Sequence, residues 1–250
     1  MKTIPLLATL LLSFMLPLHL AGCTTTSSSG KPDRAKAAEY NAKLGAGYLQ
    51  RGRYDLAKEY LEKALKKDHN SSMAQHYYAL LQEKLGRDDQ ANRYFRLALK
   101  QDGKNPELLN NFGTFLCKQG QHTEAVNAFL RAAGDPLYKT PEFAYTNAGI
   151  CLEKQGRKDT AEAYFRKALT YNDKFPLALY NLAQLAHEQN ENAKAQAFLY
   201  RYNEQAPSSP ETLLLCYRIH QSLHENDKAE NCANRLLARF PASPEANELN

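Results

Sequence analysis

Tryptophan is absent from this 250-residue chain, and glycine and proline are scarce, with 12 and 11 residues. Because the chain instead holds 15 tyrosine and 10 phenylalanine residues, we expect a helix-rich fold with many aromatic packing positions. Neither sign of charge dominates: 32 Lys and Arg stand against 27 Asp and Glu, and the net charge of +5 is too small and scattered to indicate nucleic-acid binding. With 43% apolar and 24% charged residues, extended disorder and a multispan membrane protein are both excluded.

The sequence also lacks the motifs that mark common catalytic sites. It contains no G-x-S-x-G, no H-E-x-x-H, no phosphate-binding loop and no G-x-G-x-x-G. Its cysteines have no zinc-type C-x-x-C spacing. His220 and His224 are spaced i, i+4 and could share a metal-binding face, but a core-side position and a turn position favour structural roles. We therefore expect no enzyme activity, no cofactor, no metal and no small-molecule substrate.

The first 22 residues read as an export signal. After a short basic start, residues 4–20 form an apolar run that ends in Leu-Ala-Gly-Cys at 20–23. This ending resembles the lipobox of bacterial lipoproteins, in which the cysteine receives a diacylglycerol and the chain is cut just before it. The resemblance implies lipidation at Cys23, and an ordinary signal peptide with a chance cysteine is the alternative. Aspartate after the lipidated cysteine would retain a lipoprotein at the inner membrane, but Thr24 stands there. The resemblance therefore implies that the protein is located at the outer membrane and faces the periplasm.

Residues 23–37 are expected to form a flexible tether behind the lipid. The stretch 24–33 reads TTTSSSGKPD and has no apolar residue to bury. Ten such residues have an r.m.s. reach of roughly 17 Å. The folded part would therefore sit close to the bilayer.

The rest of the chain is an internal repeat. Alanine recurs every 34 residues, and once after 36, at Ala57, Ala91, Ala125, Ala161, Ala195 and Ala229. Five residues before these alanines stand Gly52, Gly86, Gly120, Gly156, Asn190 and His224. Four residues after them stand Leu61, Phe95, Phe129, Phe165, Leu199 and Ala233. Each unit predicts a helical hairpin that turns where glycine or asparagine tolerates a left-handed backbone, with small residues where the two helices approach.

This pattern resembles the tetratricopeptide repeat. In that repeat a large residue, leucine, glycine and tyrosine are followed by alanine, an aromatic residue, a second alanine and proline at these offsets. The resemblance implies an all-α fold, a right-handed superhelical solenoid of six repeats over 38–243. The repeats start near 38, 72, 106, 142, 176 and 210. The last repeat departs from the pattern as an end cap does, and residues 244–250 are assigned to a C-terminal tail.

In such repeats the concave face is lined mainly by the first helices. In repeats one and two we predict a partner-binding groove of six apolar residues: Ala42, Ala46, Leu49, Met73, Tyr77 and Leu80. Packing against a neighbouring repeat or the tether is the alternative for them. In repeats three to five one position of this face is always asparagine, and we predict a peptide-backbone ladder of Asn111, Asn147 and Asn181. Amides can give and accept hydrogen bonds along an extended backbone, although asparagine is also a common turn-tolerant filler.

Four cysteines remain if Cys23 is acylated. Cys216 and Cys232 are expected at one level of the hairpin in repeat six, and Cys117 and Cys151 at similar heights on adjacent first helices. Both pairs are therefore predicted to form disulfides in the oxidising periplasm, with buried free thiols as the alternative.

A lipobox followed directly by six such repeats is similar to the type IV pilus biogenesis and stability proteins, the PilF/PilW pilotins. The segment NNFGTFLCKQGQHTEAVNAFLRAA strengthens the resemblance. It implies an outer-membrane lipoprotein that binds the pilus secretin and promotes its localisation, its multimerisation and pilus stability, with other pilus-assembly proteins as further partners. A lipoprotein scaffold for peptidoglycan hydrolases or cell-division factors shares this architecture and is the alternative.

Overall fold

The computed structural model describes residues 31–249, so that the predicted signal peptide, Cys23 and the first part of the tether lie outside the described residues. Within this range all regular secondary structure is helical. The helices are α1 (Lys31–Gln50), α2 (Tyr54–Lys67), α3 (Ser72–Lys84), α4 (Asp88–Gln101), α5 (Pro106–Lys118), α6 (His122–Ala133), α7 (Pro141–Glu153), α8 (Lys158–Tyr171), α9 (Pro176–Glu188), α10 (Asn192–Asn203), α11 (Pro210–Ser222), α12 (Asn226–Arg239) and α13 (Pro244–Asn247).

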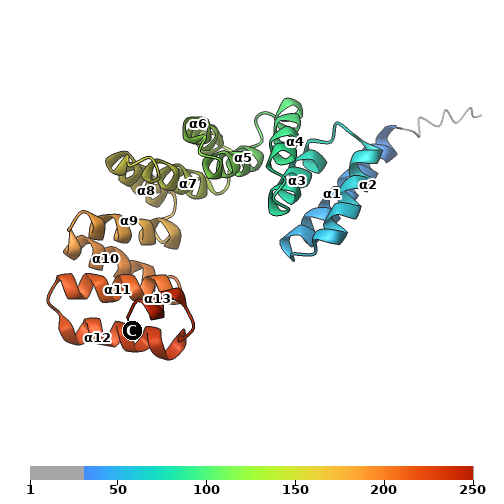
Figure 1. The fold of residues 1–250 in the computed structure, drawn as a ribbon. Helices are drawn as coiled ribbons and strands as arrows, with labels where there is room; N and C mark the ends of the chain where they lie inside the picture. Colours follow the sequence, from blue (N-terminus) through green and yellow to red (C-terminus); the bar gives the residue numbers. More distant parts are fainter. Residues whose placement is uncertain (1–30, 250) are drawn as a thin grey trace, which may run out of the picture.

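Helices α1 to α12 pair in chain order into six hairpins, and each hairpin stacks on the next one. The stack bends into an arc, with α1 and α2 at one end and α11 and α12 at the other, where α13 is added (Figure 1). Every hairpin contacts mainly its neighbours, which is the construction of a repeat solenoid. The prediction of an all-α tetratricopeptide-repeat solenoid is confirmed.

Each hairpin turns through one residue with a left-handed backbone. The φ angle is positive at the six predicted positions: Gly52, Gly86, Gly120, Gly156, Asn190 and His224. Past this residue, a backbone N–H bonds back to a carbonyl of the preceding helix, as from Arg53 N to Tyr48 O at 2.9 Å. Such a bond closes the end of the first helix and reverses the chain. At 190 and 224 a side chain has to occupy the left-handed region, which costs more than glycine does.

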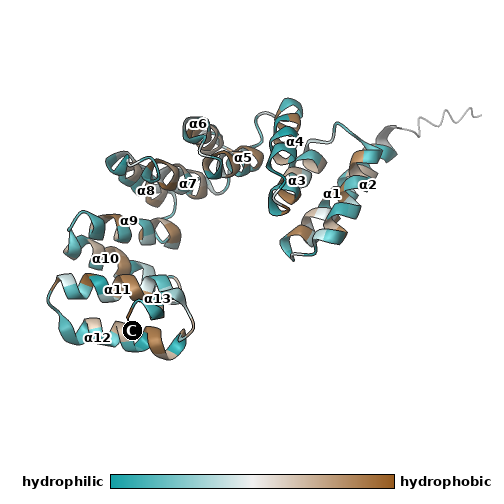
Figure 2. Cartoon of the chain, in the orientation of Figure 1, coloured by the Kyte–Doolittle hydropathy of each residue, from teal (hydrophilic) through white to brown (hydrophobic). Residues whose placement is uncertain are grey.

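The two helices of a hairpin approach closely at the small residues of the repeat. A Cβ atom added to Gly149 would lie 2.5 Å from Cε1 of Phe165, so no side chain fits there without displacing the ring. Phe165 itself is fully buried, as are its counterparts in other repeats, Leu61, Phe95 and Phe129. Figure 2 accordingly shows apolar stretches alternating with hydrophilic ones along the hairpins. Burying these side chains contributes roughly 1.5–3 kcal/mol each.

Both ends of the solenoid differ from the prediction. Helix α1 begins at Lys31, so residues 31–37 are helical and do not belong to a tether. Alanine, lysine and arginine favour the helix over this stretch, and Pro32 is tolerated because a first helical turn does not use its N–H. At the other end, residues 244–247 form α13 instead of a tail, and Ala246 is fully buried against Leu213 and Leu236. Helix α13 therefore caps the last repeat.

An apolar hollow on the first two repeats

A hollow of about 390 Å³ opens over the first helices of repeats one and two and reaches the start of α5. Its walls are mostly apolar and are formed by Ala46, Leu49, Tyr77 and Leu80, and its rim carries Gln50, Lys84, Glu107 and Asn111. Leu49 and Leu80 are only half-buried, so part of their apolar surface faces solvent. The hollow can therefore receive an apolar side chain.

Four of the six residues predicted for the groove line this hollow, and two do not. Ala42 is fully buried and packs with Ala64 and Ala74 where α1, α2 and α3 meet. Met73 packs against the same small cluster. For Ala42 the prediction is wrong and the packing alternative holds, because the stacking of repeat two on repeat one turns this part of the helix face inward. For Met73, which is half-buried, the groove position stays a prediction.

Tyr77 connects the apolar wall to the polar rim. Its ring stacks on His76, with the centroids 4.9 Å apart, and its hydroxyl donates to Oε1 of Glu107 at 3.3 Å. Burial, followed by the negative charge of Glu107, raises the pKa of the Tyr77 hydroxyl. The phenol therefore stays neutral and presents an uncharged aromatic surface to the hollow.

His76 supports the hollow from behind. Burial lowers its pKa from 6.5 to about 4, so the ring is neutral at physiological pH. Its Nε2 atom lies 3.0 Å from Nδ2 of Asn111. Since an amide nitrogen can only donate, Nε2 accepts this bond and the ring proton sits on Nδ1. The neutral ring thereby fixes the Asn111 amide at the rim of the hollow.

The three asparagines of the predicted ladder have different hydrogen-bond partners. Asn111 donates to His76, Asn147 donates to Oδ1 of Asn110 at 3.0 Å, and Asn181 donates to the Leu177 carbonyl of its own helix at 2.6 Å. Asn181 is also buried. Of the three, only Asn111 lines the hollow of repeats one and two. Each of the three amides thus has one partner within the solenoid, and the ladder stays a prediction.

Of the rim residues, Asn111 was predicted as part of the asparagine ladder, whereas Gln50, Lys84 and Glu107 were missed by sequence reasoning. Glu107 and Asn111 occupy the second and sixth positions of repeat three, which are concave-face positions of the repeat. Glu107 was left out because the predicted groove was limited to repeats one and two, and continuing the same positions into repeat three would have found it.

The four remaining cysteines are joined in the predicted pairs. One disulfide links Cys117 of α5 to Cys151 of α7, with Cα atoms 5.8 Å apart, and so ties repeat three to repeat four. The other links Cys216 of α11 to Cys232 of α12, with Cα atoms 6.0 Å apart, within repeat six. Of the two histidines considered as a metal pair, His220 bonds Glu225 at 2.6 Å, whereas His224 sits in the turn. The spacing of these two histidines therefore has a structural origin.

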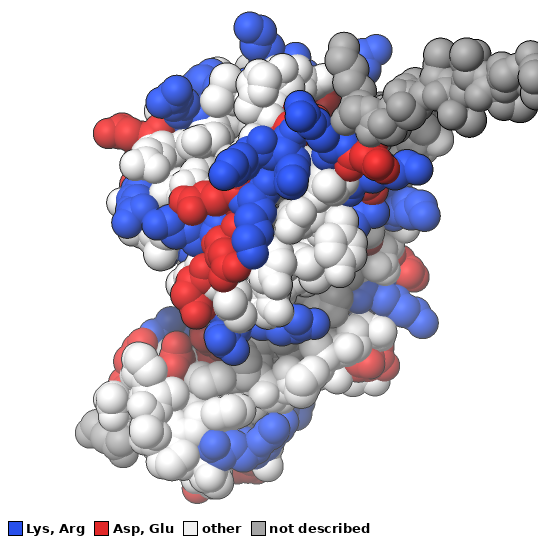
Figure 3. Space-filling model, turned by 90° about the vertical axis from the view of Figure 1, so that its right-hand side faces the viewer, with Lys and Arg blue, Asp and Glu red and all other residues white. Residues whose placement is uncertain are grey.

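The outer face at the α1–α2 end carries charges of both signs. Figure 3 shows basic and acidic side chains interspersed over it. Several of them pair along the helices, including Lys43 with Glu39 at 2.6 Å and Lys63 with Glu59 at 2.5 Å. Exposed pairs of this kind contribute little to stability and keep the face solvated. Of residues 31–249, no helix combines the length and the apolar character that crossing a bilayer requires.

Comparison with known proteins identifies the family of the chain. Models of the tetratricopeptide repeat match residues 43–106, 111–176 and 152–213. The type IV pilus assembly protein PilF of Pseudomonas aeruginosa is 30% identical over 242 residues, which covers 95% of this chain and 96% of the relative. The chain belongs to the PilF/PilW family. Its members are tetratricopeptide-repeat proteins of type IV pilus biogenesis.

Solved structures of the family agree with this fold. The structure of PilF from Pseudomonas aeruginosa superposes with a TM-score of 0.78 at 29% identity, covering 87% of this chain and 98% of that one. The structure of PilW, a widely conserved type IV pilus biogenesis factor, gives a TM-score of 0.79 at 30% identity, covering 85% and 97%. The chain is thus a type IV pilus biogenesis protein of the PilF/PilW type.

Proposed function

We propose that this chain is a lipid-anchored scaffold of the outer membrane that binds the type IV pilus secretin. In this role it promotes localisation and multimerisation of the secretin and stabilises the pilus. The hollow on repeats one and two would capture a segment of the secretin subunit before assembly. The role is binding and involves no chemistry on the partner.

The observation that carries this proposal is the open apolar hollow in a protein of the pilus biogenesis family. Apolar walls with a neutral tyrosine favour an apolar side chain of the partner, since burying such a group contributes roughly 1.5–3 kcal/mol. The amides of Gln50 and Asn111 at the rim match the peptide groups of an extended segment. The preferred ligand is therefore an extended peptide with an apolar anchor residue.

The test replaces Leu49 and Leu80 together by glutamate in the full-length, exported protein. Two charges in the hollow should abolish co-purification with the secretin and lower the amount of secretin multimers, while the helical circular dichroism signal stays unchanged. The matched control is Leu137→Glu, because Leu137 is 85% exposed in the connection before α7. This control should retain both activities.

Normal secretin binding in the Leu49→Glu, Leu80→Glu variant would contradict the proposed site. Recovery of a peptidoglycan hydrolase or a cell-division factor in place of the secretin would contradict the proposed partner. The two results are distinguishable. If the partner is wrong but the site is right, the unchanged protein still binds a hydrolase or a cell-division factor, and the double substitution removes that binding.

The lipid anchor is tested separately at Cys23. The unchanged protein should incorporate labelled palmitate and sediment with outer membranes, and Cys23→Ser should do neither. Outer-membrane recovery of an unlabelled Cys23→Ser protein would contradict the anchor without bearing on the hollow.

A further inference from the structure

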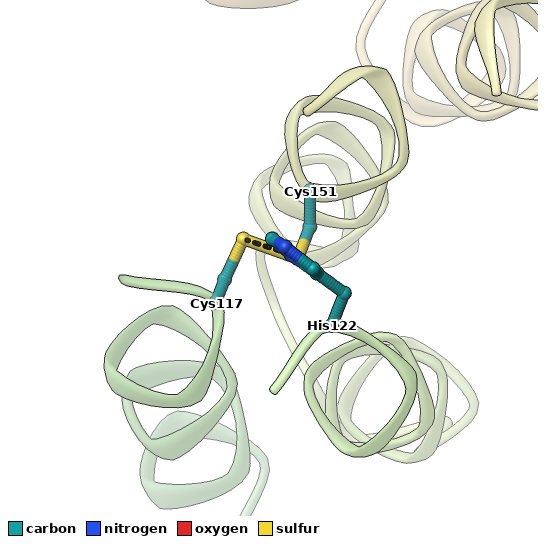
Figure 4. Close-up of side chains that lie close together, drawn as sticks. All are labelled: Cys117, His122 and Cys151. Atoms are coloured by element: carbon teal, nitrogen blue, oxygen red, sulfur yellow. Dashed lines mark hydrogen bonds between the residues drawn. A yellow bond between two sulfur atoms is a disulfide. The ribbon is translucent and has the colours of Figure 1, made fainter. Parts of the chain in front are cut away.

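Two cysteines and a histidine converge where repeat three meets repeat four. Cys117 lies in the last turn of α5, His122 is the first residue of α6, and Cys151 lies near the end of α7 (Figure 4). The left-handed turn at Gly120 folds His122 back over Cys117, and the stacking of the next repeat brings in Cys151. The three ligand atoms all lie within 4.8 Å of one another.

The two sulfur-to-nitrogen distances in this cluster match those between the ligands of a zinc ion. The Nδ1 atom of His122 lies 3.4 Å from Sγ of Cys151 and 3.8 Å from Sγ of Cys117. In a tetrahedral site, with Zn–S of about 2.3 Å and Zn–N of about 2.0 Å, the sulfur-to-nitrogen edge is about 3.5 Å. The imidazole nitrogen is thus placed at the ligand position relative to both sulfurs.

We propose that the reduced form of this cluster is a zinc site, with Cys117, Cys151 and His122 as its three protein ligands. Two thiolates and an imidazole are ligands that suit Zn²⁺, whereas Mg²⁺ and Ca²⁺ prefer oxygen. Two thiolates also neutralise the charge of Zn²⁺, which matters because the surroundings, including Leu116 and Ala148, are apolar. The fourth ligand is a water molecule on the side of His122, which is half-buried, whereas Cys151 is fully buried.

The disulfide and the zinc site exclude each other. Reduction breaks the Sγ–Sγ bond of Cys117 and Cys151 and takes two electrons and two protons from a dithiol reductant, which becomes a disulfide itself. Binding of Zn²⁺ then releases the two thiol protons, and the sulfurs move apart to about 3.8 Å, the tetrahedral edge. The junction between repeats three and four would therefore have two alternative cross-links, one covalent and one through the metal.

Repeat six contains a similar set of residues in a different setting. Cys216, His220 and Cys232 also lie within 4.8 Å of one another. There, however, Nδ1 of His220 faces a carboxylate oxygen of Glu225 at 2.6 Å, and Lys228 holds the other oxygen at 2.9 Å. In the first cluster the same nitrogen faces the two sulfurs. The proposal is therefore limited to the cluster of Cys117, His122 and Cys151, and the other one has to be removed in the test.

The experiment titrates Zn²⁺ into the full chain carrying Cys216→Ser and Cys232→Ser, in competition with a chromogenic zinc chelator. After reduction by a phosphine, one Zn²⁺ per chain should bind, and none after oxidation. Adding Cys117→Ser and Cys151→Ser, which gives a four-serine variant, should abolish this binding. Because Cys23 is present in all variants, any binding of Zn²⁺ to it does not affect the comparison. Adding His122→Ala should weaken it by at least about tenfold. Co²⁺ in place of Zn²⁺ should give a thiolate-to-metal charge-transfer absorption only in the reduced form of the chain that carries Cys216→Ser and Cys232→Ser, which we call the host.

Equal Zn²⁺ binding by the reduced host and the four-serine variant would overturn the proposal. So would equal binding by the reduced and the oxidised host. If the host loses its helical circular dichroism signal, the comparison is made between the reduced unmodified chain and its Cys117→Ser, Cys151→Ser variant. These two should then differ by one Zn²⁺, and no difference between them would overturn the proposal as well.

Discussion

The two ends of the solenoid share one repeat but present different surfaces. At the N-terminal end, the hollow of repeats one and two has walls of alanine, leucine and tyrosine. At the C-terminal end, a hollow of about 450 Å³ between α9 and α11 is lined by Leu177, Tyr180 and Tyr202 together with Glu211. Beside it lie Glu188, Glu245 and Glu248, and Arg218 pairs with Glu248.

This difference separates the residues that build the repeat from those that shape its exposed surface. The left-handed turn and the buried alanine five residues after it recur at both ends because every hairpin needs them. The exposed positions of the first helices are free of this constraint and differ. At the C-terminal end Leu177 and Tyr180 stand beside Glu188 and Glu211, and α13 closes the stack. At the N-terminal end they leave an apolar surface whose rim carries Lys84 and Glu107.

The largest expected effect is the loss of stability on removing a disulfide that the C-terminal end contains and the N-terminal end does not. Replacing Cys216 and Cys232 by serine should lower the free energy of unfolding by about 3 kcal/mol, because the bridge closes a loop of 16 residues. Since each repeat contacts mainly its neighbours, we expect amide hydrogen exchange to speed up in α11 and α12 and to stay unchanged in α1 and α3. An equal loss of protection in α1 would show that the two ends are not independent.

Replacing one tyrosine at each end compares the two hollows directly. Tyr77→Ala should weaken secretin binding by about 2 to 3 kcal/mol, which is roughly 30- to 160-fold, as expected of a central aromatic anchor. Tyr180→Ala should leave the affinity unchanged within a factor of about two, because its hollow is not part of the proposed site. The affinity of each variant for the purified secretin domain can be measured by calorimetry. A larger loss from Tyr180→Ala would move the site to the C-terminal end.

The buried histidine makes the N-terminal end sensitive to acid. The folded state lowers the pKa of His76 from 6.5 to about 4, so between these values the unfolded chain binds the proton more readily. The stabilisation from neutral His76 is complete above pH 6.5 and declines as the pH falls, by about 2 kcal/mol at pH 5. This loss can be measured by urea unfolding at pH 7 and pH 5, monitored through the hydrogen exchange of the α3 amides. The variant His76→Gln should lack it, and an unchanged pH dependence in that variant would contradict the assignment.

The smallest effects are expected at the turns, where the two ends again differ. His224→Gly should stabilise the chain by up to about 1 kcal/mol, since glycine adopts the positive φ at this turn without a steric penalty. Gly52→Ala should destabilise it by about 1 kcal/mol for the same reason. Urea midpoints of the two variants test this, and a gain in stability from Gly52→Ala would refute the explanation.

Much of the fold could be predicted because the repeat carries its own local signals. The turn at Gly52 and the close approach at Gly149 each require a residue type that the sequence displays at a fixed offset. What could not be predicted depends on how one repeat lies against the next. The burial of Ala42, the cap formed by residues 244–247 and the convergence of His122 on two sulfurs are set by stacking, to which no local pattern corresponds.

The candidate site was predicted in part for the same reason. Leu49 and Leu80 stand at first-helix positions that belong to the concave face of the repeat, so the pattern was enough to find them. The amides of Asn111, Asn147 and Asn181 occupy equivalent positions but have different hydrogen-bond partners. Equivalent positions therefore predict where a side chain lies, whereas its partners depend on the neighbouring residues of each repeat.

The most direct test of the central claim is site-specific photo-crosslinking in living cells. A photoreactive phenylalanine derivative is placed at position 49 in the N-terminal hollow or at position 177 in the C-terminal one, and the cells are irradiated during pilus assembly. The account predicts a covalent adduct with the secretin subunit from position 49 and none from position 177. A secretin adduct from position 177, with none from position 49, would contradict it.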